Sequence, residues 1–91
     1  ATLGAAMYLL LGRVFCDIGK LDDAKRLVSV LAKKRPDLNE IPSLLLKLDG
    51  AYARKGDRQS RKACLSYICK HFPLSPEAEI AKQQLATRLD N

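Results

Sequence analysis

Tryptophan is absent from this sequence of 91 residues, and two phenylalanines and three tyrosines are its only large aromatic side chains. Apolar residues nevertheless make up 47% of the chain and charged residues 29%, which is an ordinary mixture for a water-soluble domain. The core must therefore be mainly aliphatic. A chain of this length forms one small domain, or one part of a larger protein, with a thin core.

The sequence also lacks the patterns that usually mark catalytic and metal sites. His71 is the only histidine, and it lies near the end of a predicted helix, where a cation simply suits the helix dipole. No glycine-rich phosphate loop is present, and Cys16, Cys64 and Cys69 lack the CxxC or CxxH spacing of zinc ligands. We therefore predict a protein that is not an enzyme and that holds neither a cofactor nor a metal.

No hydrophobic run is long enough to cross a bilayer. The uncharged stretch from Ala1 to Gly12 falls short of the roughly 20 residues that a spanning helix needs, and it lacks the basic start of a signal peptide. Three cysteines are an odd number without a secretory signal, which favours free thiols in a reducing compartment. We expect a cytoplasmic location, with this chain as a soluble piece of a longer or membrane-attached protein.

The most informative pattern is an internal repeat with a spacing of 37 residues. Residues of like character recur at this spacing as seven pairs: Tyr8 and Leu45, Leu11 and Leu48, Phe15 and Tyr52, Gly19 and Gly56, Val28 and Leu65, Leu31 and Ile68, Pro36 and Pro73. Repeats of this length are typical of arrays of helical hairpins.

Apolar residues at spacings of three and four predict five helices, and the residues between them predict the helix ends. The expected helices run from Leu3 to Ile18 before Gly19, from an Asp22 cap to Pro36, from Ile41 or Pro42 to Gly56, from an Asp57 cap to Pro73, and from a Ser75 cap to about residue 90. The short connections make neighbouring helices antiparallel.

The first copy resembles the tetratricopeptide repeat (TPR) through Tyr8, Leu11, Gly12, Phe15, Ala24, Val28, Leu31 and Pro36. The ending HFPLSPEAEIAKQQL is similar to the close of bacterial TPR chains. The resemblance implies an all-α fold, in which antiparallel helical hairpins form a right-handed superhelix of about five helices. The single domain would comprise repeat one at about 5–38, repeat two at about 42–75 and a capping helix at about 76–90.

The second copy departs from this pattern at two positions. Asp49 replaces the glycine found at Gly12, and Arg61 replaces the alanine found at Ala24. Both positions belong to the crossing of the two helices of a hairpin, where small residues are expected. We therefore expect the second hairpin to be splayed, or shifted in register, relative to the first.

TPR proteins hold peptides or partner helices on the concave face that the first helix of each hairpin forms. The resemblance places Leu9 and Leu46 in an apolar groove on that face, with Arg13 and Arg54 at its edge, which would suit an amphipathic helix with acidic flanks. The alternative is that these leucines pack against neighbouring domains.

Positive charge is concentrated between residues 51 and 72, within a chain whose net charge is +6. A basic patch of Arg54, Arg58, Arg61 and Lys62 could hold nucleic acid, a membrane surface or an acidic protein, or it could be a solvated helix face.

The sequence thus predicts a non-catalytic module for protein–protein interaction or self-association. Its partner would be a protein or peptide, or a second copy in a homodimer. A basic anion-binding module is the alternative, and a purely structural spacer is a third possibility. Nucleic acid is the less favoured partner, because Tyr52 and Tyr67 fall on predicted core stripes and leave no platform for stacking bases.

Overall fold

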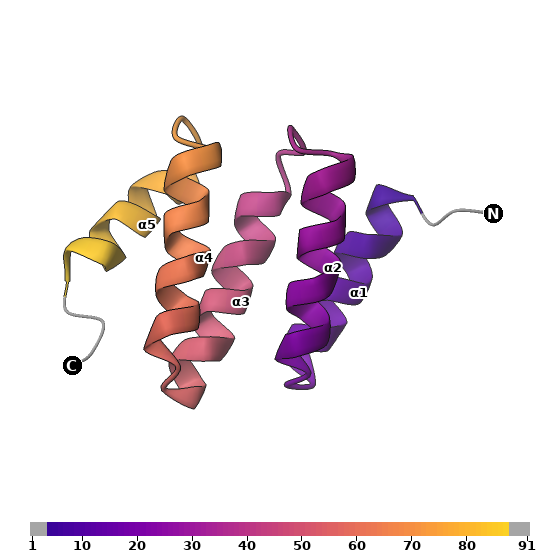
Figure 1. Cartoon of the computed structure of the whole chain (residues 1–91), viewed down its shortest axis with the longest axis horizontal. Coiled ribbons are helices and arrows are strands. Elements are labelled where there is room, and N and C mark those ends of the chain that lie inside the picture. Colours follow the sequence, from indigo (N-terminus) through magenta and orange to yellow (C-terminus); the bar gives the residue numbers. More distant parts are fainter. Residues whose placement is uncertain (1–3, 88–91) are drawn as a thin grey trace.

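Two features of the sequence, periodic aliphatic residues and well-placed turn residues, produce five α-helices in the computed structural model, which describes residues 4–87 (Figure 1). The helices are α1 (Ala5–Asp17), α2 (Leu21–Lys34), α3 (Ile41–Lys55), α4 (Arg58–His71) and α5 (Pro76–Ala86). The elements of the described residues are all α-helices, so the all-α prediction is confirmed. Each helix packs antiparallel to the next, as the short connections predict. The predicted start at Leu3 and the last residues of the predicted fifth helix lie outside the described residues.

The two turns inside the hairpins are built alike. Gly19 and Gly56 both adopt the left-handed conformation, with φ of 79° and 74°, as expected for glycines that end helices. In both turns two backbone hydrogen bonds close the end of the preceding helix. The donor–acceptor pairs are Gly19 N to Cys16 O (3.3 Å) and Lys20 N to Phe15 O (2.8 Å), then Gly56 N to Ala53 O (3.1 Å) and Asp57 N to Tyr52 O (3.0 Å).

The connections after α2 and α4 are also alike. Their backbone hydrogen bonds recur 37 residues apart: Arg35 N to Leu31 O and Phe72 N to Ile68 O, Leu38 N to Arg35 O and Ser75 N to Phe72 O, Ile41 N to Leu38 O and Ala78 N to Ser75 O. The backbone therefore follows the same path out of both hairpins.

Side-chain caps begin two of the helices, as the sequence predicts. The backbone N–H of Ser60 donates to Asp57 Oδ1 (3.1 Å) at the start of α4, and the N–H of Ala78 donates to Ser75 Oγ (3.1 Å) at the start of α5. The predicted Asp22 cap is wrong, because α2 already begins at Leu21 and has no side-chain cap. The tight Gly19 turn brings Leu21 into the core, which leaves Asp22 inside the first turn.

The core lies around α3, which contacts all four other helices. Ile41, Leu44, Leu45 and Leu48 of α3 are buried, together with Leu65 and Ile68 of α4. Gly12 lets α3 approach α1 closely, because a Cβ atom there would stand 2.9 Å from Cδ2 of Leu44. α3 therefore joins the two hairpins into one packed unit.

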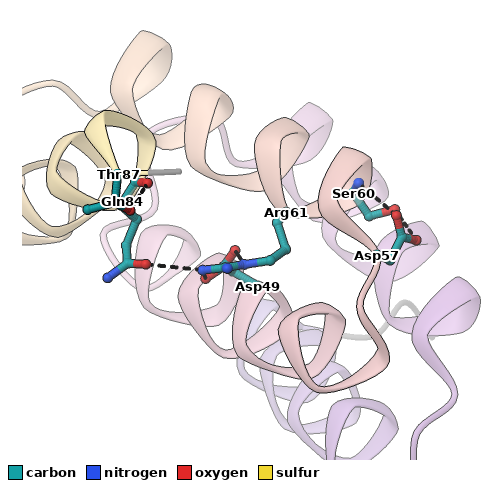
Figure 2. A network of polar contacts seen from close by, with 6 residues as sticks. All are labelled: Asp49, Asp57, Ser60, Arg61, Gln84 and Thr87. Atoms are coloured by element: carbon teal, nitrogen blue, oxygen red, sulfur yellow. Dashed lines mark hydrogen bonds and ion pairs between the residues drawn. The ribbon is translucent and has the colours of Figure 1, made fainter. Parts of the chain in front are cut away.

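The two residues that depart from the repeat pair with each other (Figure 2). Arg61 of α4 binds the carboxylate of Asp49 of α3 through Nε at 2.9 Å and a terminal nitrogen at 3.3 Å, and the same terminal nitrogen donates to Gln84 Oε1 of α5 at 3.2 Å. The Arg61 and Asp49 side chains are only 16% and 9% exposed. The turn hydrogen bonds of the second hairpin keep the spacing of the first, although this ion pair stands where the first hairpin has Gly12 and Ala24.

Within residues 4–87, none of the helices combines the length and the apolar character needed to span a bilayer. This agrees with the sequence-based prediction for that part of the chain.

Candidate functional site

A hollow of about 320 Å³ lies between α2 and α4, with α3 as its floor. Figure 1 shows α2 and α4 on either side of α3, and these two helices do not contact each other. Leu45, Leu48 and Tyr52 of α3 form the floor. The walls are Lys25, Val28, Ser29, Ala32 and Lys33 of α2, and Ser60, Ala63, Cys64 and Tyr67 of α4.

Small side chains on the two walls keep the hollow open. Val28 of α2 and Cys64 of α4 are buried beside the floor, whereas the flanking wall positions carry Ser29, Ala32 and Ala63. These side chains are too short to reach across α3 and fill the space between the helices. The hollow therefore exists because the residues that flank Val28 on α2 and Cys64 on α4 have small side chains.

The hollow is apolar inside and positively charged along one rim. Lys25 and Lys33 are exposed on the α2 wall, and no acidic residue lines the hollow. The Tyr67 ring on the opposite wall packs against the His71 ring, with 4.2 Å between the two ring centroids. This arrangement can accept apolar groups that are accompanied by negative charge on the α2 side.

Burial keeps the Cys64 thiol and the Tyr52 phenol of the hollow protonated at neutral pH. Burial raises the pKa of the Cys64 thiol to about 12, and the nearby Asp49 carboxylate adds to the rise. Burial also raises the pKa of the Tyr52 phenol. Because a thiol needs its thiolate form to act as a nucleophile, Cys64 contributes contact surface at neutral pH.

The four residues predicted to form a groove, Leu9, Arg13, Leu46 and Arg54, do not line the hollow. Leu9 is 8% exposed and packs in the core, and Leu46 is half-buried. Arg13 and Arg54 are exposed. The hollow instead uses Leu45, Leu48 and Tyr52, which point away from Leu46 on α3.

The predicted basic patch loses one of its four members. Arg54 on α3 and both Arg58 and Lys62 on α4 are exposed, whereas Arg61 turns inward to Asp49 and Gln84. The repeat alignment marked Arg61 as unusual, and its acidic partner was the other unusual residue, so the pairing had a signal in the sequence.

Neither a family of proteins, nor a curated protein, nor a solved structure matches this chain significantly. In the part of the chain that the structure describes, no three histidine, cysteine or acidic side chains gather in a way that could hold a metal ion. The functional argument therefore rests on the surfaces of the molecule itself.

Proposed function

We propose that this chain is a non-catalytic protein-interaction module of TPR-like helical hairpins, which binds a segment of a partner protein in the hollow between α2 and α4. The apolar hollow with a lysine rim is the observation that carries the proposal. The recurrence of the turn hydrogen bonds at 37 residues supports the repeat assignment. So does the packing order, since α3 packs on α1 and α2 as α5 packs on α3 and α4.

The chemistry of the hollow favours an amphipathic helix with acidic residues along one flank. Its apolar side chains would cover Leu45, Leu48 and Tyr52, and its acidic residues would meet Lys25 and Lys33. These lysines stand about 12 Å apart along α2, given a rise of 1.5 Å per residue, so they match acidic residues two turns apart on the bound helix. Helices that lie in apolar grooves are a recurrent mode of recognition.

The anion-binding alternative has less support in the same surfaces. The inward turn of Arg61 removes one cation from the patch proposed for it. Tyr52 is buried and Tyr67 is half-buried against His71, so neither ring offers an open face for stacking nucleic-acid bases. A protein segment fits the hollow better than nucleic acid does.

The affinity should be modest. A volume near 320 Å³ lies at the small end of binding pockets and admits only a few side chains. Burial of each large aliphatic side chain contributes about 1.5–3 kcal/mol, and association itself opposes binding, so we expect dissociation constants in roughly the micromolar range.

A selection from a displayed library of helical peptides tests the proposal. We expect selected peptides to be amphipathic and rich in aspartate and glutamate. Ala63→Glu places a larger and negatively charged side chain on the hollow wall, so it should weaken peptide binding by about tenfold or more, the equivalent of about 1.4 kcal/mol. Ser66→Glu, an equally charged change at an exposed position of α4 outside the hollow, should bind as the wild type does.

Two results would contradict the proposed function. One is a selection that yields no peptide with measurable affinity. The other is a set of peptides that bind Ala63→Glu as tightly as they bind the wild-type protein, with circular dichroism showing that both are equally helical.

A further inference from the structure

A stripe of four large apolar side chains lies uncovered on α1 and its end. Met7, Leu10, Val14 and Ile18 are 45%, 53%, 41% and 58% exposed. Their spacings of three, four and four residues place them on one face of the helix. We call this set the α1 stripe. Within residues 4–87, the other large apolar side chains that are exposed are Val30, Leu74 and Ile80, which lie singly on α2, the α4–α5 connection and α5.

The corresponding face of α3 shows what such a stripe is used for in this fold. The positions 37 residues later are Leu44, Lys47, Ala51 and Lys55, and three of them contact the preceding hairpin. Leu44 packs over Gly12, Lys47 Nζ binds Asp17 Oδ1 at 2.9 Å, and Lys55 Nζ donates to Gly19 O at 3.3 Å. The face that carries the α1 stripe is therefore the face by which α3 packs on another helix.

The α1 stripe differs from the α3 face in charge, and this difference indicates its partner. Two lysines on the α3 face recognise polar atoms at the end of α1. The α1 stripe has no charged member, and residues 4–12 carry no charge at all. Its partner must therefore offer an apolar helical surface rather than a charged helix end.

Among the described residues, the α1 stripe is the one group of exposed large apolar side chains that recur at helical spacing. The outer face of α5 offers Ile80 among Glu77, Glu79 and Lys82, so head-to-tail stacking of two copies would bury charged residues against apolar ones. Pairing the α1 stripe with the same stripe of a second copy brings four exposed apolar side chains of each copy together. Such a contact uses the same patch on both copies and closes after two.

We propose that two copies of this chain form a twofold-symmetric dimer through Met7, Leu10 and Val14 of α1 and Ile18 directly after it. The interface is one helix packed on one helix, which is small for a stable protein complex. The dimer should accordingly dissociate within roughly the micromolar range of concentration. It leaves the hollow between α2 and α4 open, because the hollow has no residue on α1.

Sedimentation equilibrium of the 91-residue chain tests the dimer, at concentrations from about 1 μM to about 1 mM that bracket a micromolar dissociation constant. The average mass should rise toward twice 10.1 kDa as the concentration increases. Leu10→Glu should shift dimerisation to at least tenfold higher concentration. Ile80→Glu, an equally charged change at an apolar side chain of similar exposure on α5, should leave it unchanged.

A wild-type protein that stays monomeric at every concentration would overturn the dimer, and would assign the stripe to another partner. A Leu10→Glu variant that dimerises as the wild type does would also overturn it, as would equal dissociation by Ile80→Glu. Both variants change exposed positions, and circular dichroism would verify their helix content. Peptide binding by Leu10→Glu and dimerisation of Ala63→Glu separate this proposal from the proposed function, since each variant should affect one property alone.

Discussion

The two hairpins reach the same backbone path through different chemistry. In the first, Gly12 and Ala24 are buried, and Gly12 lies against Leu44 of α3. In the second, the matching positions carry Asp49 and Arg61, which form an ion pair. The first hairpin needs only small residues at these two positions. The second needs both charged side chains, together with a hydrogen bond from Arg61 to Gln84 of α5. The matching positions of a helical hairpin can thus hold either small residues or a charged pair.

The largest effect should follow from breaking this pair on one side. Asp49→Ala leaves the Arg61 guanidinium largely buried without its carboxylate, and an unpaired buried charge is costly. We expect a loss of about 2–4 kcal/mol in the free energy of unfolding. Urea denaturation followed by circular dichroism measures it. A loss below about 0.5 kcal/mol, the size usual for surface changes, would mean that the pair contributes no more than an exposed one.

The double replacement should cost less than the sum of its parts. Asp49→Gly combined with Arg61→Ala restores the small residues of the first hairpin and leaves no buried charge unpaired. Residues in direct contact commonly couple by about 0.5–3 kcal/mol, and we expect a value in that range from a double-mutant cycle of urea denaturation curves. Additive effects would contradict an energetic interaction between the two side chains.

The starts of α2 and α4 give a third contrast, because only α4 has a side-chain cap. Asp57→Ala should lower the melting temperature by several degrees, whereas Asp22→Ala should change it little. The hydrogen bonds from Ser60 hold the pKa of the Asp57 carboxyl below its usual range. The cap therefore stabilises the fold above the ordinary carboxyl pKa near 4, and this contribution disappears as pH falls through the lowered pKa.

Melting curves at several pH values check the contribution of the Asp57 cap. The difference between wild type and Asp57→Ala should be constant near neutral pH and should shrink in acid. A difference that persists unchanged in strong acid would show that the carboxylate is not the source of the effect.

The smallest effects concern two glycines inside helices. Gly50 has only an Arg54 nitrogen near the place of a Cβ, at 3.8 Å, so Gly50→Ala should stabilise the protein by about 0.5–1 kcal/mol through helix propensity. In Gly12→Ala the same gain is opposed by the contact with Leu44 at 2.9 Å. Thermal denaturation should rank Gly50→Ala as the more stable variant. The reverse order would show that α1 and α3 are not closely packed at Gly12.

Local signals in the sequence predicted most of the fold. Gly19, Gly56, Asp57 and Ser75 act through atoms within a few residues of themselves, and each ends or begins a helix as expected. The Asp22 prediction was wrong because burial of Leu21, a tertiary effect, decides where α2 begins.

The surfaces were harder to predict, since they depend on contacts between helices. The hollow arises from the sizes of side chains on α2 and α4, which are neighbours only through α3. The sequence predicted that Arg61 belongs to a basic patch, whereas in the structure Arg61 is paired with Asp49. Leu9 counted as a groove residue, and the structure buries it in the core. In each case the sequence does not show which helix packs against the residues concerned.

The hollow has a mechanical consequence, because its two walls belong to different hairpins and touch only through α3. Under the proposed function, a segment bound in the hollow would contact both hairpins and would favour the angle between them at which it fits best. Conversely, a change in that angle would change the shape of the hollow and so the affinity for the segment.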